Sequence, residues 1–566
     1  MQSRSLRLLA LCRALPALFL ANTVGAAPAP ERFERECVVS DSLLASQVGA
    51  SILARGGNAV DGAIATAFAL AVTHPAAGNV GGGGFLVVRM SDGRATTFDF
   101  REKAPLASVP EMFSKPDGSY DPDRHHWSIL SVGVPGSVAG LHLAHSRLGK
   151  LPWAELVQPA VDLAAKGFPV TQGLAQSIRE VLPSLRKQAA AEAQFTRSGV
   201  PLEAGDTLIQ KDLARTLERI RDQGPRGFYE GETADLLVRE MEANGGLIRH
   251  DDLRKYRAKE REPVRGTYRD VQIISMPPPS SGGTAIIEIL NLLEAYDVRS
   301  MGVRSSAEVH LLAECMRRAF ADRALLLGDP DFAPIPVDRL TSKSRAAELR
   351  RSISLSKASH SSPERFEWPA EGTETTHVSV VDRDLACVSL TTTIEQSYGS
   401  RIVVTGAGFL LNNEMGDFNP RAGMTTRGGL VGTPPNLVAP EKRMLSSMSP
   451  SILERGGKPI LVVGSPGGRT IINTVLEVIV NCIDHGLDVQ AAVSAPRFHH
   501  QWLPDRIVAE AACLSEGVRK TLEALGHEVQ VSSEPQGSAM AISILPGKGL
   551  EAGVDRRRHD TGAAGR

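Results

Sequence analysis

Helical and strand-like hydrophobic patterns alternate in the first part of the chain. After Asn58, apolar residues recur every three or four positions, which predicts a helix capped by that residue. The apolar run 85–90 predicts a buried strand, and Asp92-Gly93 predicts a hairpin turn into a second strand that ends near Arg101. Leu and Ala at helical spacing predict that residues 140–325 are mostly helical. The pattern therefore favours a fold that mixes helices and strands.

The pattern changes in the middle of the chain. Residues 335–374 are polar, rich in Ser, Arg and Glu, and have no clear period, which is typical of a linker. Directly after them, residues 376–381 alternate and residues 387–394 are rich in β-branched side chains, so we expect two strands joined by a turn near Arg383-Asp384. A strand thus begins abruptly at Thr375, immediately behind an exposed segment.

The last third of the chain continues the mixed pattern. Residues 455–458 predict a hairpin, an apolar stripe predicts a helix from Arg469 to about Ile483, and a final segment mixes a helix with strands. No stretch after the N-terminal region is apolar enough to span a membrane.

The first 26 residues have the composition of a secretory signal. Arg4 and Arg7 precede the apolar stretch 8–20, and Val24-Gly25-Ala26 fits a cleavage site. We therefore expect export to the periplasm or the cell exterior, with the mature chain starting near Ala27. The alternative is a short anchored helix, which needs roughly 20 apolar residues and does not have them.

Composition and charge narrow the function classes. The chain has 566 residues and a net charge of -1, so nothing suggests nucleic acid or an anionic membrane as a partner. A charged substrate must then be met by a local site. The cysteines that follow the signal contain no CxxC, which makes a zinc knot unlikely and leaves open one disulfide or buried thiols.

Thr375 is a candidate nucleophile because of its place at the start of a strand. A threonine hydroxyl reacts poorly unless a base lies beside it. An N-terminal threonine carries its own base, since the pKa of an α-amine is about 7.7 to 8.0. A cut before Thr375 would produce such a residue, and an exposed linker permits the cut. The alternative is an ordinary strand threonine.

The residues around Thr375 resemble the signature of the γ-glutamyltranspeptidase (glutathione hydrolase) family. The signature comprises Thr375-Thr376-His377-Val378-Ser379-Val380-Val381-Asp382, then residues 391–395 and Tyr398-Gly399. Further stretches that are similar to the family occur in the family's order from about residue 36 onward: 56–63, 79–85, 99–102, 412–418, 445–450, 464–468 and 495–505.

The resemblance implies both a fold and a maturation step. It implies an α+β fold of the N-terminal-nucleophile hydrolase type, a four-layer αββα sandwich. It also implies a proenzyme that cuts itself between Glu374 and Thr375 through an ester on the Thr375 hydroxyl. The expected products are a large subunit, 27–374, and a small subunit, 375–566, which remain associated as one folded unit.

The same resemblance assigns roles to site residues. The α-carboxylate of a γ-glutamyl group falls to Arg101, Ser446 and Ser447, and its α-ammonium to Glu395, Glu414 and Asp417. Thr393 matches a threonine that bonds the nucleophile hydroxyl, and Gly467 and Gly468 match the oxyanion hole. We therefore expect a pocket with Arg101 at one end and three acids at the other. So many like charges predict a shared proton, or one acid that pairs elsewhere.

Two features depart from the best-known members of the family. Glu395 stands where they usually have asparagine, and glutamate there resembles the branch that includes capsule poly-γ-glutamate depolymerases. Residues 424–432 carry no aromatic side chain, so an aromatic gate is not expected and the site is predicted to be more open.

We therefore expect a γ-glutamyl hydrolase and transferase. Its donors are glutathione and related compounds, its acceptors are water, amino acids or peptides, and it needs no cofactor. A poly-γ-glutamate depolymerase or a cephalosporin-type acylase is the alternative within the family. An inactive secreted binding protein is the alternative of a different class, against which the intact Thr375, Thr393 and Arg101 argue. No metal is expected, because His125-His126 and His499-His500 lack a carboxylate or cysteine at ligand spacing.

Overall fold

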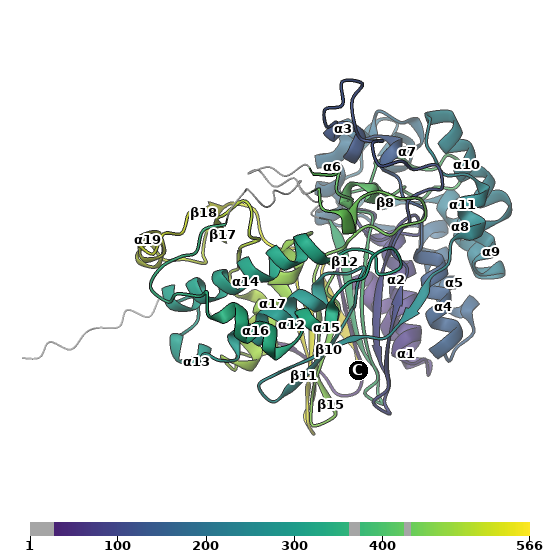
Figure 1. The fold of residues 1–566 in the computed structure, drawn as a ribbon. Coiled ribbons are helices and arrows are strands. Elements are labelled where there is room, and N and C mark those ends of the chain that lie inside the picture. Colours follow the sequence, from purple (N-terminus) through teal and green to yellow (C-terminus); the bar gives the residue numbers. More distant parts are fainter. Residues whose placement is uncertain (1–27, 362–373, 424–431) are drawn as a thin grey trace, which may run out of the picture.

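The computed structural model describes residues 28–361, 374–423 and 432–566 of the chain (Figure 1). The expected signal, 1–26, lies outside the described residues, as does nearly all of the stretch 424–432 for which no aromatic gate is expected.

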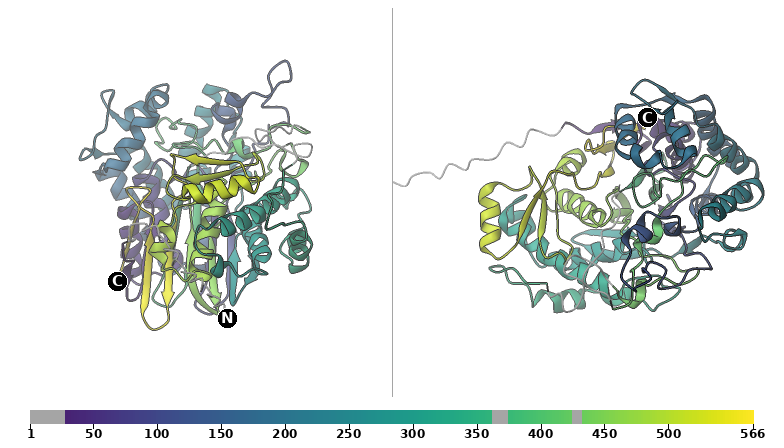
Figure 2. Two further views of the ribbon diagram at one scale, coloured as in Figure 1. Left: turned by 90° about the vertical axis from the view of Figure 1, so that its left-hand side faces the viewer. Right: turned by 90° about the horizontal axis from the view of Figure 1, so that it is seen from above.

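Two seven-stranded antiparallel sheets form the centre of the molecule (Figures 1 and 2). The first sheet has the order β21 (Gly562–Gly565), β2 (Cys37–Ser40), β12 (Thr375–Val381), β13 (Cys387–Thr393), β3 (Gly83–Arg89), β4 (Ala95–Asp99) and β9 (Lys259–Arg261). The second has the order β1 (Glu31–Phe33), β20 (Gly549–Val554), β19 (Met540–Leu545), β15 (Lys458–Gly464), β14 (Ser451–Arg455), β11 (Val271–Ser275) and β10 (Val264–Tyr268). Each sheet combines strands from before and after the Glu374–Thr375 bond.

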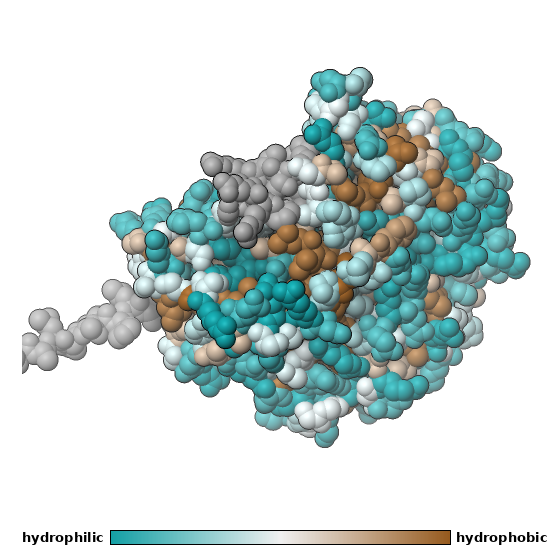
Figure 3. All heavy atoms as spheres, in the orientation of Figure 1, coloured by the Kyte–Doolittle hydropathy of each residue, from teal (hydrophilic) through white to brown (hydrophobic). Residues whose placement is uncertain are grey.

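Alternation along the strands of the first sheet directs its side chains to two cores. Val38 and Val88 pack in a cluster with the helices on the outer face, whereas Val39 and Val87 pack against the second sheet. The outer helices beside the first sheet are α1 (Leu43–Ala54), α2 (Ala59–Thr73), α4 (Ser137–Leu148) and α5 (Trp153–Lys166). On the far side of the second sheet lie α12 (Gly282–Leu293), α14 (Ser306–Leu326), α17 (Thr470–Ile483) and α18 (Val489–Ser494). The predicted αββα order is therefore confirmed. Hydrophilic residues dominate the surface of the face that is drawn in Figure 3.

The remaining elements lie at the periphery and between the layers. The helices are α3 (Pro122–His126), α6 (Gln172–Leu185), α7 (Ala189–Phe195), α8 (Lys211–Gln223), α9 (Arg226–Tyr229), α10 (Gly231–Asn244), α11 (His250–Lys255), α13 (Val298–Met301), α15 (Val337–Leu340), α16 (Lys343–Arg350) and α19 (Glu516–Ala524). The short strands are β5 (Phe168–Pro169), β6 (Thr196–Arg197), β7 (Val200–Pro201), β8 (Thr207–Leu208), β16 (Phe498–His499), β17 (Ile507–Glu510) and β18 (Val529–Ser532). None of the described helices is both long and apolar enough to cross a membrane.

Most of the predicted elements are present, and two regions differ. Asn58 caps α2 in a capping box with Asp61, and the hairpin 455–458 joins β14 to β15. The prediction of a linker over 335–374 was wrong for its first half, because α15 and α16 occupy it. Helix α16 buries little besides Ala346, so its sequence shows no apolar stripe. The mostly helical region also contains β10 and β11, which are short strands between Leu- and Ala-rich helices.

The cysteines of the described residues are all free thiols. Four of them are buried, and Cys482 is partly buried. Of the two alternatives left open by the sequence, the structure therefore has the buried thiols.

A polar seam between the two sheets contains His377, which is fully buried. Its Nδ1 lies 2.8 Å from the Thr391 hydroxyl and its Nε2 lies 3.1 Å from the Ser379 hydroxyl. Burial lowers the pKa of His377 to about 3, so the ring is neutral. Gly464 of the second sheet packs directly on this ring.

We expect Gly464→Ala to destabilise the protein by about 1–3 kcal/mol, because overpacking displaces buried groups. A Cβ at this position lies 2.1 Å from His377 Cε1. Thermal and urea unfolding measure the effect. Gly517→Ala is the matched control, since a Cβ there meets nothing within 4 Å. Equal stability of the two variants would contradict the close packing of the sheets at His377.

Candidate active site

One end of the two sheets gathers the residues that the sequence singled out. Thr375 begins β12 and lies directly opposite Thr393, the last residue of β13, a register that spacing through the turn did not fix. Arg101 follows the end of β4 at the same edge. In the second sheet, Ser447 precedes β14 and Gly468 follows β15. Because neighbouring antiparallel strands begin and end at the same edge, distant segments meet there.

A cavity of about 20 Å³ lies at this edge. Most of the predicted site residues line it: Arg101, Thr375, Thr393, Glu395, Glu414, Asp417, Ser446, Ser447 and Gly468. Met448 and Ile471, which the sequence did not single out, complete the lining. The other two predicted residues, Glu374 and Gly467, are not part of the lining but directly precede lining residues in the sequence.

The Thr393 hydroxyl faces the bond before Thr375. It donates to the Glu374 carbonyl oxygen at 3.1 Å and accepts from the Glu395 N–H at 2.8 Å. The expected hydrogen bond to the Thr375 hydroxyl is therefore replaced, in the unbroken chain, by one to the Glu374 carbonyl. A hydroxyl in this position polarises the carbonyl and stabilises negative charge on its oxygen.

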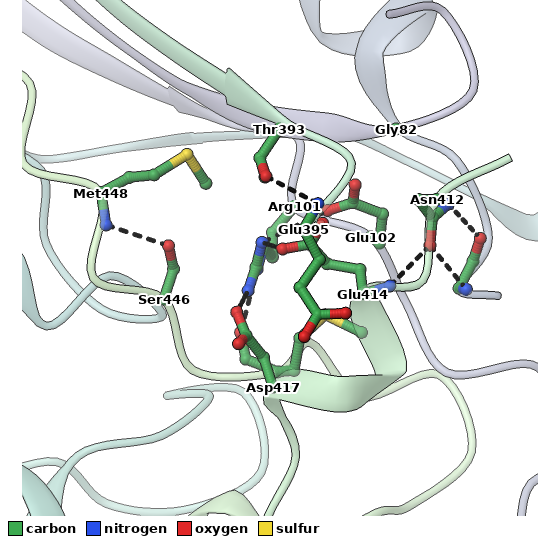
Figure 4. Close-up of polar contacts among 12 residues, drawn as sticks. Gly82, Arg101, Glu102, Thr393, Glu395, Asn412, Glu414, Asp417, Ser446 and Met448 are labelled. Atoms are coloured by element: carbon green, nitrogen blue, oxygen red, sulfur yellow. Dashed lines mark hydrogen bonds and ion pairs between the residues drawn. The ribbon is translucent and has the colours of Figure 1, made fainter. Parts of the chain in front are cut away.

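Arg101 does not lie opposite the acids, which corrects the expected division of the pocket. Its guanidinium is fully buried and forms ion pairs with Glu414 and Asp417 (Figure 4). The Met444 carbonyl accepts from Nε at 3.2 Å, and Glu102 lies 3.6 Å from Nη1. The reason is that an isolated buried arginine is costly, so the acids that share its cavity pair with it.

Several buried acids share this single guanidinium, and their pKa values respond. Burial raises the pKa of Glu414 to about 8, and Asp417 and Glu395 add to the rise although Arg101 opposes it. Burial, followed by the Glu414 charge, raises the pKa of Glu102 well above its usual range. Burial lowers the pKa of Arg101, but the acids outweigh it and the net change is upward. The site thus retains a proton among its carboxyl groups near neutral pH.

Glu395 also has a partner that sequence reasoning missed in this role. Its carboxylate lies 3.3 Å from His126 Nδ1, and its backbone has a positive φ of 74°. His126 belongs to α3, and its carbonyl accepts from the Asn413 side chain at 2.8 Å. The pair His125-His126 is visible in the sequence, but the sequence alone relates it only to a metal site. Of the two outcomes expected for crowded acids, Glu395 has a separate partner in His126, and the raised pKa values of Glu102 and Glu414 favour a shared proton.

Hydroxyl and backbone groups form another part of the cavity lining. The Ser446 hydroxyl accepts from the Met448 N–H at 3.1 Å, and the Ser447 hydroxyl accepts from Arg323 at 2.8 Å. Gly467 and Gly468 have φ values of 130° and 55°, a conformation that L side chains rarely adopt. They form the tight turn between β15 and α17.

A separate group of potential metal ligands lies outside this site. Among the described residues it consists of His310, Glu314 and His527. His310 Nδ1 lies 2.7 Å from His527 Nε2, as in a hydrogen bond, and Glu314 pairs with Arg317 and Arg318. These atoms are engaged with protein partners, and two guanidinium groups beside the carboxylate disfavour a cation there.

Comparisons with known proteins agree with the motifs and the fold. The profile of the family described as Gamma-glutamyltranspeptidase matches residues 45–565. The chain is 45% identical to the glutathione hydrolase proenzyme of Escherichia coli (strain K12), over 95% of this chain and 93% of that protein. It is 38% identical to the Acylase ACY 1 proenzyme of Pseudomonas sp. (strain SE83), over 91% of each.

A solved structure extends the agreement to three dimensions. The cephalosporin acylase from Bacillus halodurans has a TM-score of 0.84 at 26% identity, covering 97% of this chain and 98% of that one. The profile spans nearly the whole chain, and the fold is that of the matched structure. The chain therefore belongs to the γ-glutamyltranspeptidase family, as an enzyme of the γ-glutamyl hydrolase and transferase kind.

Proposed function

We propose that this chain is an exported proenzyme that cuts itself between Glu374 and Thr375 and then cleaves γ-glutamyl amides, with glutathione as a donor. The observation that carries the proposal is the convergence of Thr375, Thr393 and Arg101 on one cavity at a strand end. Residues 1–26 are the proposed signal, and 27–374 and 375–566 are the proposed subunits. The interleaved strand order supports their continued association after the cut.

The cut is an acyl shift within the chain. The Thr375 hydroxyl oxygen attacks the Glu374 carbonyl carbon, and the Thr393 hydroxyl, 3.1 Å from the carbonyl oxygen, stabilises the negative charge that develops there. The C–N bond breaks, the amine takes the proton, and an ester joins Glu374 to Thr375. Water opens the ester, leaving a free α-amine and a free hydroxyl on Thr375.

Turnover then uses the same hydroxyl with the new amine as its base. Thr375 attacks the γ-carbonyl of the donor, and its α-amine moves the proton to the leaving amine. The N–H groups of Gly467 and Gly468 stabilise the oxyanion, at about 3 kcal/mol for such a donor. Water or the amine of an amino acid or peptide opens the γ-glutamyl ester, giving hydrolysis or transfer.

Recognition of the donor follows from the charges already present. The donor's α-carboxylate binds the Arg101 guanidinium, and the hydroxyl groups of Ser446 and Ser447 donate hydrogen bonds to it. Its α-ammonium is expected beside the carboxyl groups of Glu395, Glu414 and Asp417, which favour a positive charge. The cavity of about 20 Å³ holds roughly one water, so a donor is expected to bind only after the cut has freed the Thr393 hydroxyl from the Glu374 carbonyl.

A cephalosporin acylase is the second candidate, since one relative is named an acylase and a matched structure is that of a cephalosporin acylase. The two functions differ at the α-ammonium, which a γ-glutamyl donor has and a simple carboxyacyl donor lacks. The buried acids favour the γ-glutamyl donor, because a donor with a carboxylate and no ammonium adds only negative charge to a site that already holds several acids.

We expect Thr375→Ala to stay as one uncut chain and to be inactive, because it lacks the attacking oxygen. N-terminal sequencing of the smaller wild-type fragment is expected to begin Thr375-Thr376-His377. Denaturing gels and a γ-glutamyl-p-nitroanilide assay measure both properties. The exposed Thr521→Ala is the control. Active wild-type enzyme that runs as a single uncut band would contradict the mechanism.

We expect the affinity of the mature enzyme for L-glutamate to rise with pH up to about 8, the value to which burial raises the pKa of Glu414 in the uncut chain. Below that pH the carboxyl is protonated, and binding an ammonium releases the proton, so affinity weakens by about tenfold per pH unit. Competitive inhibition constants between pH 6 and 8.5 measure the effect. Glu414→Gln is expected to bind weakly with little pH dependence, whereas the exposed Glu516→Gln keeps the wild-type profile. A pH-independent wild type would contradict the retained proton.

We expect kcat/KM for γ-glutamyl-p-nitroanilide to exceed that for glutaryl-p-nitroanilide by about 100-fold or more, because only the first substrate carries an α-ammonium to meet the carboxyl groups of the site. The two substrates differ only at the α-ammonium. Asp417→Asn is expected to reduce the ratio of the two kcat/KM values. Equal or faster turnover of the glutaryl substrate would instead support the acylase.

A further inference from the structure

Three consecutive arginines in the segment between β20 and β21 have three different environments. Arg556 is largely exposed and lies 3.7 Å from Glu31. Arg557 is held by two acids, Glu510 at 2.8 Å and Asp555 at 3.0 Å. Arg558 turns instead toward the start of β12. The partners of the first two arginines are acids on the same segment or nearby, whereas the partners of Arg558 lie at and around the start of β12.

Arg558 contacts both residues of the Glu374–Thr375 bond. Its Nη2 donates to Glu374 Oε2 at 2.7 Å, and its Nη1 donates to the Thr375 carbonyl oxygen at 3.3 Å. A planar guanidinium presents its donors in a fixed fork, so one side chain fixes the two residues relative to each other. The Glu374 N–H donates to the Glu395 carbonyl at 3.2 Å, which holds the bond from the opposite side.

The surroundings of Arg558 strengthen its hold on Glu374. His74 Nε2 lies 3.5 Å from Nη1, and burial together with Arg558 lowers the pKa of His74 to about 4, so this ring is neutral. Asp41 lies 3.8 Å from Nη1. Burial raises the pKa of Asp41, although Arg558 opposes the rise. Glu374 is thus the nearest acid to the guanidinium among the described residues.

The strand order explains how the C-terminal segment reaches the cut. Strand β21 pairs with β2, and β2 pairs with β12. The segment that precedes β21 therefore runs past the first residue of β12. Its arginine arrives there only when the first sheet is complete.

We propose that Arg558 is a positioning residue for the cut, and that it makes an acidic side chain at position 374 part of the cleavage signal. It holds the Glu374 side chain and the Thr375 carbonyl so that the Glu374 carbonyl meets the hydroxyls of Thr375 and Thr393. Arg558 exchanges no proton in the reaction. The inference rests on the proposed cut between Glu374 and Thr375.

Cell-free synthesis followed by a chase on denaturing gels tests the proposal by measuring the rate of the cut. Arg558→Gln and Glu374→Gln are each expected to slow the cut by about tenfold or more, since each removes the ion pair between the two side chains. Arg558→Gln also removes the hydrogen bond to the Thr375 carbonyl, so the double variant is expected to be no slower than Arg558→Gln. Arg558→Lys is expected to recover part of the rate, and the exposed Arg556→Gln to match the wild type.

Each outcome separates this proposal from the proposed function. Wild-type rates for Arg558→Gln and Glu374→Gln, or additive losses in the double variant, would overturn the positioning role while leaving the cut intact. A wild-type chain that is not cut before Thr375 would overturn the proposed function instead. If Arg558→Gln fails to fold, the comparison of Glu374→Gln with Arg558→Lys decides, because Glu374 is partly exposed at the end of its strand.

Discussion

The pairing of β12 with β13 is the constraint on which the rest of the site depends. It sets Thr375 opposite Thr393 and aligns the Glu374 carbonyl with the Thr393 hydroxyl. Strand β2 borders β12 on its other side, so the first residue of an interior strand carries the candidate nucleophile. Thr375 itself pairs only with Thr393, but the strand that it begins is held on both sides from Val378 onward, which limits its movement. This rigidity suits the proposed action of one hydroxyl first on a bond of its own chain and later on a substrate.

The charges of the site are interdependent rather than separated. Arg101 pairs with Glu414 and Asp417, His126 lies beside Glu395, and burial raises the pKa values of Glu102 and Glu414, which favours a shared proton. A buried cluster of charged side chains is stable only when its positive and negative charges nearly cancel. A zwitterionic donor fits such a site because it adds one charge of each sign and keeps the balance. The net charge of -1 for the whole chain gives no sign of this concentration.

The motifs around Thr375, together with their order along the chain, were sufficient to predict the layers of the fold and the residues that line the cavity. The facing of Thr375 and Thr393 depends on strand register, which a turn of unknown geometry leaves open. The pairing of Arg101 with acids and the contact of His126 with Glu395 arise from packing between distant segments. Helix α16 escaped prediction because it lies on the surface with almost no apolar face. Arg558 lies in a run of arginines that reads as a solvated surface until the strand order is known.

The interleaved strands have a consequence for the mature protein. Each sheet contains strands from both sides of the Glu374–Thr375 bond. While the bond is intact, all of these strands belong to one molecule, and folding is independent of concentration. The proposed cut would change this, because unfolding would then release two separate molecules whose reassembly follows mass action. The lifetime of such a cut protein would depend on its rate of unfolding rather than on ready refolding.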